Sequence, residues 1–184
     1  MRFDAQEHID RWYTQGHYPA IHSPVVKMAV NELRGVRGVD VCCSHGLLGT
    51  QLFKNHGLNM IGVDGDHKAI TLAREQGIPM PIHEMKINRA TAKEFFVECV
   101  MHGAQFLIMR RCVPELFGDD LDFGREFFST AESVGIKEIV LEGRVRTPKA
   151  TNKLATVEAE IALAQPFFRV FAAEGNVAYL RVDE

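Results

Sequence analysis

The sequence FFRVFAAEGNVAYLRV, residues 167–182, contains two short runs rich in apolar and aromatic residues. Between the runs lies Glu174-Gly175-Asn176, a combination typical of a tight β-hairpin turn. Strands joined by so short a loop are antiparallel, because a parallel connection needs a crossover of about a dozen residues or more. We therefore predict that the chain ends in an antiparallel hairpin of strands 167–172 and 177–182.

Before this hairpin, strand and helix patterns alternate. Such an order predicts βαβ units, whose right-handed crossovers build a parallel sheet with helices on both faces. The fold class that we expect is α/β, with three α-β-α layers and a seven-stranded, mostly parallel, Rossmann-like sheet. The strands are predicted at 36–41, 60–63, 81–87, 105–109 and 137–141, and the helices at 47–57, 66–77, around 95–100, from about 124, and around 154–164.

The first 35 residues are expected to form a helical cover over this sheet. One short helix is predicted over residues 4–14. A second begins at Ser23, a good N-cap followed by Pro24, and ends at Gly35. A chain of 184 residues fits one domain. We therefore expect a single domain over 1–184, with a helical cover at 1–35 and an α/β core at 36–184.

Composition excludes several classes of protein. Hydrophobic residues make up 46% and charged residues 24% of the chain, which is typical of a globular protein and not of a disordered or fibrous one. A net charge of -3 argues against a uniformly basic nucleic-acid binder. No apolar run approaches the roughly 20 residues of a membrane span, and the first residues lack the apolar core of a signal peptide. We expect a cytoplasmic protein without a membrane partner.

The four cysteines and eight histidines suggest neither a disulfide framework nor a metal site. Cys42 and Cys43 are adjacent, and no pair of cysteines or histidines has the spacing usual for zinc ligands. We expect reduced thiols and no metal. The simplest interpretation of Cys42 and Cys43 is that they are small buried apolar residues at the end of a strand.

A turn follows the first predicted strand, in the sequence VDVCCSHGLLG of residues 39–49. It joins the carboxyl end of a strand to the start of a helix, where free N–H groups and the helix dipole favour a carboxylate or a phosphate. In open α/β sheets ligands bind outside these strand ends. The segment resembles the first motif of the class I S-adenosylmethionine-dependent methyltransferases, and the terminal hairpin resembles the end of their sheet.

That resemblance spans residues 36–184 and implies that S-adenosylmethionine is the cofactor. The second strand ends in IGVDGD, residues 61–66, where a carboxylate can accept hydrogen bonds from both ribose hydroxyls; Asp64 is the preferred candidate. Glu84 or Met85 would flank the adenine. The expected cofactor-binding residues are Asp40, Cys42, Cys43, Ser44, His45, Gly46, Gly49, Asp64, Gly65 and Met85.

Two features keep other interpretations open. Cys42 and Ser44 replace glycines that are usual in the family's turn, and their Cβ atoms take up space where the backbone approaches a ligand. This favours, as an alternative, a non-catalytic methyltransferase-fold protein with a binding or regulatory role. The spacing of Ser44, Gly46 and Gly49 also resembles a dinucleotide fingerprint that lacks its first glycine. A nicotinamide-dependent oxidoreductase is the second alternative, although simple nicotinamide-binding domains continue with parallel strands.

The substrate is less well defined. The motif that often follows the fourth strand in methyltransferases of exocyclic amino groups is absent, and Cys112 lacks the preceding proline of a pyrimidine C5 methyltransferase. Arginines after the fourth and fifth strands would converge at one crevice and bind an anionic group, such as a small molecule or a nucleic-acid backbone. The alternative is that nearby acids, among them Glu142, neutralise them. The candidate substrate residues are Arg110, Arg111, Arg144 and Arg146.

The segment from Trp12 to His22 combines aromatic residues with Gly16 and suggests either a lid over the cofactor or plain cover of the sheet edge. His17 and His22 are possible general bases. Methyl transfer relies mainly on bringing donor and acceptor into contact, so the absence of a catalytic triad is uninformative. We expect a methyltransferase whose substrate is unidentified, with an anionic substrate as the option that the arginines favour and with no catalytic residue assigned.

Overall fold

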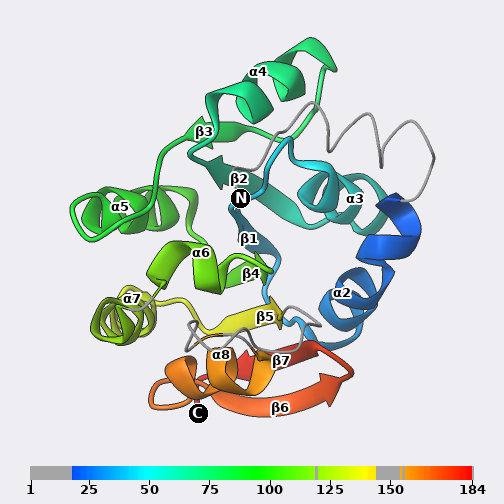
Figure 1. Ribbon diagram of the computed structural model, residues 1–184. Coiled ribbons are helices and arrows are strands. Elements are labelled where there is room, and N and C mark those ends of the chain that lie inside the picture. The colour runs from blue at the N-terminus through cyan, green and yellow to red at the C-terminus, as the bar shows by residue number, and fades with distance from the viewer. Residues whose placement is uncertain (1–17, 119, 144–153, 155, 184) are drawn as a thin grey trace.

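The computed structural model describes residues 18–118, 120–143, 154 and 156–183. Its centre is a seven-stranded sheet in the order β3-β2-β1-β4-β5-β7-β6, with helices on both faces (Figure 1). The first five strands along the chain are parallel to one another. The last two form an antiparallel hairpin, and β7 inserts between β5 and β6. The predicted α/β class, its mostly parallel sheet and its antiparallel end are therefore confirmed.

The strands begin and end within a few residues of their predicted positions. Val39 pairs with Ile61 on one side and with Leu107 on the other, so β1 is the central strand of the parallel part. The fourth and fifth strands are neighbours, as expected. The bounds are β1 Arg37–Val41, β2 Asn59–Asp64, β3 Ile82–Glu84, β4 Phe106–Arg110, β5 Glu138–Glu142, β6 Arg169–Glu174 and β7 Val177–Arg181.

The helices alternate with these strands along the chain. Asp66 caps α4 by accepting a hydrogen bond from the Lys68 N–H, as predicted, and α3 ends at Gly57 in the left-handed conformation. The bounds are α2 Tyr18–Glu32, α3 Leu47–His56, α4 His67–Glu75, α5 Ala92–His102, α6 Val113–Phe117, α7 Leu121–Ser133 and α8 Val157–Ala164.

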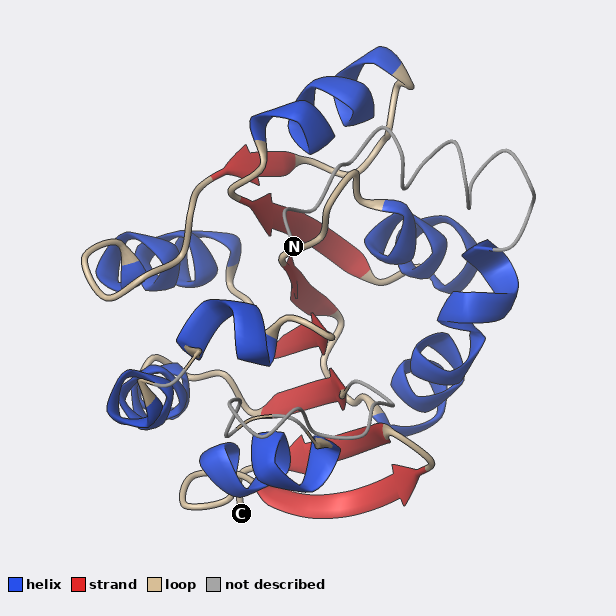
Figure 2. Cartoon of the chain, viewed as in Figure 1, coloured by secondary structure: helices blue, strands red, loops and turns tan. Residues whose placement is uncertain are grey.

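Two hydrophobic cores lie on the two faces of the sheet. The larger one packs α5, α6, α7 and α8 against the sheet, and six of its phenylalanine rings, from Phe95 to Phe128, are in edge, tilted or stacked contact. The smaller one packs α2 and α3 against the opposite face. Figure 2 shows the two helical layers on either side of the strands, with α4 beside β3 at one edge.

Three helical predictions need correction. Within the described residues helix α2 begins at Tyr18 and not at Ser23, so Pro24 lies inside it, where it costs one backbone hydrogen bond. Helix α7 begins at Leu121 because the Asp120 carboxylate accepts a hydrogen bond from the Phe123 N–H. The short helix α6 was not predicted. The predicted helix 4–14 lies outside the described residues.

A buried carboxylate attaches the end of α2 to the sheet. Glu138, at the start of β5, accepts hydrogen bonds from the N–H groups of Arg34 and Gly35, at 2.9 and 2.7 Å. The Tyr179 hydroxyl donates a third bond at 2.6 Å. Burial, followed by this contact with Glu138, raises the pKa of Tyr179. Three donors on one buried carboxylate offset its desolvation.

Candidate cofactor and substrate site

The turn after β1 has an unusual backbone. Cys42, Ser44 and Gly46 have φ angles of 55°, 54° and 77°, so every second residue from 42 to 46 is left-handed. Such angles cost a residue with a Cβ roughly 1 kcal/mol or more. Two of these residues are therefore held in this conformation by their surroundings. The turn leads directly into α3, whose N-cap Gly46 makes no side-chain capping bond.

Asp64, at the carboxyl end of β2, provides part of that restraint. Its Oδ2 atom accepts a hydrogen bond from the Ser44 N–H at 2.7 Å, and its Oδ1 atom accepts one from the Asp66 N–H at 2.8 Å. Burial raises the pKa of the Asp64 carboxyl, and these backbone N–H groups oppose the rise. One carboxylate thus joins the turn after β1 to the turn after β2.

Asp40 lies beneath the same turn and is 2% exposed. Its Oδ2 atom accepts a hydrogen bond from the Gly49 N–H at 2.9 Å, which attaches the first turn of α3 to β1. Burial raises the pKa of Asp40 to about 7, against the opposing effects of the Gly49 bond and the positive charge of Arg110. Asp40 therefore changes its charge near neutral pH.

The glycines of this region face the protein interior. A Cβ on Gly46 would lie 2.7 Å from Cδ1 of Ile82, and one on Gly49 would lie 2.3 Å from Sδ of Met80. A Cβ on Gly62 would lie 2.6 Å from Sγ of Cys43. All three distances are shorter than real Cβ contacts, so these glycines allow α3 to approach β2 and Met80 closely. The sequence analysis had placed Gly46 and Gly49 among the cofactor-binding residues, whereas in the structure they face Ile82 and Met80.

The other residues expected to bind the cofactor form two groups, one buried and one partly or fully exposed. Cys43 and His45 are 8% and 2% exposed, and Nδ1 of His45 lies 3.1 Å from Oγ of Ser44. Cys42, Ser44, Asp64 and Met85 are partly exposed, and Gly65 is exposed. The backbone of Lys86 crosses close to Gly65, where a Cβ would lie 2.8 Å from its Cα. The partly exposed group is the one that a ligand outside the strand ends would meet.

The residues present fit S-adenosylmethionine in two respects. The N-cap Gly46 has no side chain to cap α3, and Asp40 occupies the Gly49 N–H, which leaves the N–H groups of Leu47 and Leu48 for a carboxylate. Each oxygen of Asp64 accepts one backbone bond and retains a lone pair for a ribose hydroxyl. The side chains of Cys42 and Ser44 occupy space that glycines would leave open.

Arg110 and Arg111, at the end of β4, share one carboxylate. Nε of Arg110 lies 2.7 Å from Oε2 of Glu142, and Nε of Arg111 lies 2.5 Å from Oε1. Glu142, at the end of β5, is 2% exposed. Two guanidinium groups on one carboxylate leave a net charge of about +1 at this edge. Arg144 and Arg146, which were expected to join them, lie outside the described residues.

The four cysteines are free. Cys112 is buried, and a hydrogen bond with Cys42, followed by burial, raises the pKa of its thiol. Burial also raises the pKa of Cys43. Thiols with raised pKa values are poor nucleophiles. His22 is 4% exposed within α2, and Trp12 and His17 lie outside the described residues.

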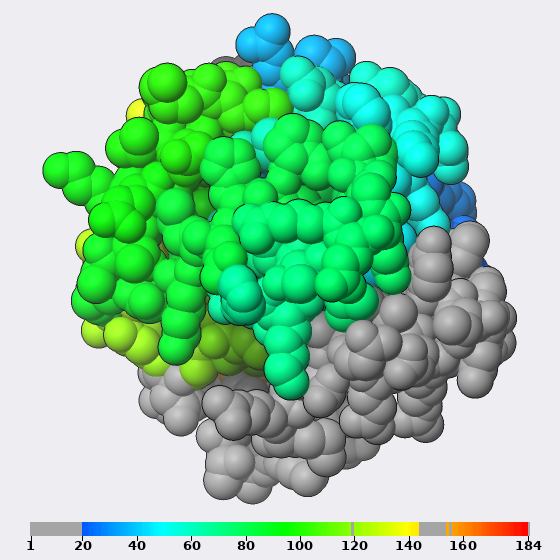
Figure 3. All heavy atoms as spheres, turned by 90° about the horizontal axis from the view of Figure 1, so that it is seen from above, coloured from blue at the N-terminus to red at the C-terminus, as the bar shows by residue number. Residues whose placement is uncertain are grey.

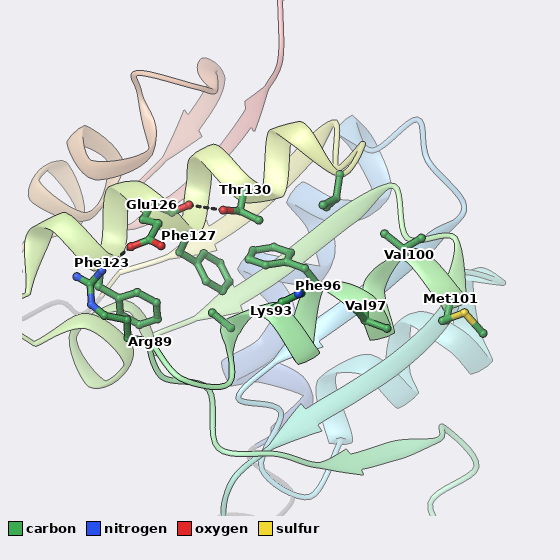
Figure 4. A pocket seen from close by; sticks show the side chains of 12 residues that line it. Arg89, Lys93, Phe96, Val97, Val100, Met101, Phe123, Glu126, Phe127 and Thr130 are labelled. Carbon is green, nitrogen blue, oxygen red and sulfur yellow. Dashed lines mark hydrogen bonds and ion pairs between the residues drawn. The ribbon is translucent and has the colours of Figure 1, made fainter.

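Sequence reasoning missed an apolar groove of about 380 Å³ between α5 and α7 (Figure 4). Its walls include Phe96, Phe127 and Val100, and Arg89 lies at one end, paired with Asp120 and Glu126. On α5, Val97, Val100 and Met101 are 51 to 80% exposed. Their i, i+3, i+4 spacing was the available signal, but spacing does not distinguish a buried face from an exposed one.

Among the described residues, no group of three or more metal-ligating side chains converges. No helix in this part of the chain combines the length and the apolar character needed to cross a membrane.

Comparison with known proteins identifies the fold. No protein-family model and no curated protein sequence matches the chain. Solved structures do. The PH0226 protein from Pyrococcus horikoshii OT3 is 13% identical, with a TM-score of 0.70 over 99% of this chain and 100% of that one. The N-methyltransferase NodS from Bradyrhizobium japonicum WM9 is 12% identical, with a TM-score of 0.64 over 91% of this chain and 97% of that one.

Two further structures show how widely the fold is used. The bifunctional kinase-methyltransferase WbdD is 14% identical, with a TM-score of 0.55 over 98% of this chain and 40% of that one. The [4+2]-cyclase SpnF is 12% identical, with a TM-score of 0.58 over 88% of this chain and 62% of that one. With its strand order, the chain has the Rossmann-like fold of the class I S-adenosylmethionine-dependent methyltransferases. Identities this low show the fold alone.

Proposed function

We propose that this protein is an S-adenosylmethionine-dependent methyltransferase whose cofactor site is the Cys42–Gly46 turn together with Asp64. The observation that carries the proposal is the pair of hydrogen bonds that Asp64 accepts from the N–H groups of Ser44 and Asp66, which joins two turns at the carboxyl ends of adjacent strands. NodS, which shares the fold, has been solved in complex with S-adenosyl-L-homocysteine, with a TM-score of 0.62 and 11% identity. That likeness supports the choice of cofactor.

In this proposal each residue has a structural task. The oxygens of Asp64 accept hydrogen bonds from the ribose hydroxyls, and the N–H groups of Leu47 and Leu48 at the start of α3 bind the methionine carboxylate. Asp40 keeps the start of α3 attached to β1. S-Adenosylmethionine, when bound, supplies a sulfonium methyl group that a nucleophile displaces in line. The contribution of this chain is then to position the two reactants.

In this proposal Arg111 binds an anionic group of the substrate. Its side chain is 42% exposed, compared with 17% for Arg110, and the single carboxylate of Glu142 does not neutralise both. A guanidinium with free N–H groups suits a carboxylate or a phosphate. Replacing Arg111 with Ala should raise KM for an anionic methyl acceptor more than for its uncharged analogue. An equal change for both acceptors would remove this assignment.

A second candidate is a protein of this fold that does not transfer methyl groups. The side chains of Cys42 and Ser44 at left-handed positions favour it, because they crowd the turn. The [4+2]-cyclase SpnF shares the fold and illustrates that one scaffold can carry different chemistry. The exposed turn residues would then bind a ligand for regulation or for another reaction.

Calorimetry with S-adenosylhomocysteine and with NAD tests the cofactor. We expect the protein to bind S-adenosylhomocysteine and not NAD. The Asp64→Asn variant should bind S-adenosylhomocysteine at least about tenfold more weakly, which is the equivalent of one charge-assisted hydrogen bond. Asp122→Asn, on the exposed surface of α7, is the matched control and should bind as the unmodified chain does. NAD binding would favour an oxidoreductase, and failure of both ligands would refute the proposed cofactor site.

A labelled-methyl transfer assay then separates the two candidate functions. Transfer of label from S-adenosylmethionine to an acceptor, abolished by excess S-adenosylhomocysteine, supports an enzyme. Tight binding of S-adenosylhomocysteine with no transfer to proteins, nucleic acids or small amines would favour the non-catalytic alternative.

A further inference from the structure

The two edges of the sheet differ in how they are covered. Strand β3 has only three residues and lies beside α4, whose atoms, with those of β3, form the centre of the face in Figure 3. Strand β6 has six residues and pairs with β7 alone among the described strands. Figure 1 shows no described element beyond it. An uncovered edge strand presents unpaired N–H and C=O groups to another strand.

The side chains of β6 carry opposite charges at its two ends. Arg169 begins the strand and Glu174 ends it. Their present partners are exposed. Arg169 lies 3.6 Å from Asp183, Glu174 lies 2.9 Å from Lys27, and all four side chains are 59 to 71% exposed. Exposed ion pairs of this kind contribute little, so both charges remain available to a partner.

A β-bulge brings these two charges onto one face of the sheet. Residues five apart in a regular strand point to opposite faces. Here the register shifts between Val170 and Ala172, so Arg169 pairs with Arg181 and Glu174 with Val177. Arg181 and Val177 are four residues apart and share a face, and their partners Arg169 and Glu174 therefore share it too. Phe171, which is 46% exposed, lies between them, with the Arg181 guanidinium 4.1 Å from its ring centre.

We propose that β6 pairs antiparallel with β6 of a second copy of this chain, so that the two sheets become continuous. Antiparallel pairing about a two-fold axis sets Arg169 opposite the partner's Glu174, and Glu174 opposite the partner's Arg169. Val170 then meets the partner's Ala173, and Phe171 meets the partner's Ala172. Directly opposite residues lie on the same face, as antiparallel pairing requires. The RVFAAE segment is thus complementary to itself.

Size sets the expected strength. Six residues on each side bury less than the roughly 1,200 Å² of a stable interface, so we expect a dissociation constant on the order of 100 μM. Charge at both ends also disfavours pairing with most other strands, since only a partner with the reversed order of charges matches. That selectivity is the reason to name a second copy as the occupant.

Sedimentation equilibrium of the full chain tests the proposal. The unmodified chain should dimerise reversibly at concentrations up to about 500 μM. Arg169→Glu and Glu174→Arg should each weaken dimerisation at least about tenfold, because each sets like charges opposite each other. An equimolar mixture of the two variants should recover it, since each variant supplies the charge that the other needs. This recovery also shows that both variants are folded.

Arg125→Glu, an exposed arginine of α7, is the matched control and should dimerise as the unmodified chain does. A monomer throughout the concentration range would overturn the proposal. So would single variants that dimerise normally, because the contact would then lie elsewhere. A mixture that remains monomeric while both variants are folded by circular dichroism would overturn the proposed register.

Discussion

Asp40 is a buried carboxylic acid beneath the turn after β1. Its folded-state pKa of about 7 compares with an ordinary value of 3.8. Between about pH 4 and 7 the folded chain therefore keeps a proton that the unfolded chain has released. The stability that this proton provides is complete below about pH 4 and is lost as the pH rises to about 7.

Replacing Asp40 with Asn should remove this dependence while preserving the acceptor for the Gly49 N–H. The free energy of unfolding of the unmodified chain should fall between pH 5 and 8 by on the order of 2 kcal/mol more than that of Asp40→Asn. Urea denaturation at both pH values measures the difference. Asp122→Asn, an exposed control, should keep the full pH dependence. An unchanged dependence in Asp40→Asn would mean that Asp40 ionises normally.

Ser44 provides a second test at the level of one residue. Ser44→Gly removes the cost of a left-handed φ of 54°, and both Ser44→Gly and Ser44→Ala lose the contact with His45. The two variants thus differ mainly in backbone conformation. We expect Ser44→Gly to be more stable than Ser44→Ala by about 1 kcal/mol in chemical denaturation. Equal stability would show that the turn relaxes out of the left-handed region.

The sequence predicted the Cys42–Gly46 turn and made Asp64 a candidate ligand residue, because both follow predicted strands at the edge where α/β sheets bind ligands. The role of Asp64 in binding stays a prediction. It did not predict that Gly46 and Gly49 contact Met80 and Ile82. Those contacts join residues more than 30 positions apart, and nothing in the local pattern around residue 46 refers to the chain near residue 80. The sequence also left open whether Arg110 and Arg111 both pair with Glu142, because these residues too lie about 30 positions apart.

At the level of elements, Gly124 shows how packing overrides propensity. It lies in α7, where Ala would favour the helix by about 1 kcal/mol. A Cβ there would lie 2.4 Å from Cδ2 of Leu163, in α8. We expect Gly124→Ala to destabilise the protein by about 1 to 3 kcal/mol through overpacking. Thermal unfolding measures this, with Ser129→Ala in the same helix as a control that should be neutral or slightly stabilising.

Elements with strong local signals were predicted best. Helix α3 ends at a glycine and α4 begins at a capping aspartate, and both boundaries agree with the structure. Helix α6 has five residues, Val113–Phe117, too few to show a period. Its Val113 and Phe117 are buried against α7 and the sheet, so tertiary contacts stabilise it. The start of α2 was missed because a Ser-Pro pair also occurs within a helix.

For the whole molecule, the terminal hairpin decided the topology. Its short turn required β6 and β7 to be antiparallel neighbours, whereas the structure alone shows that β7 inserts between β5 and β6. The last strand along the chain is thus an internal strand of the sheet. Val177 and Tyr179 belong to one core, and Ala178 and Leu180 belong to the other.

Removing this hairpin should therefore abolish cooperative folding. A chain that ends at Gln165 lacks Phe168 and the four core residues of β7, whose burial stabilises the fold by on the order of 10 kcal/mol, comparable to the whole stability of a domain. Urea denaturation followed by circular dichroism should show a broad transition with a reduced slope. A chain that lacks only Asp183 and Glu184 loses one exposed ion pair and should unfold within about 1 kcal/mol of the full chain. If the chain that ends at Gln165 unfolds as cooperatively as the full chain, the two cores do not depend on β7, and β5 can serve as the edge strand of a stable sheet.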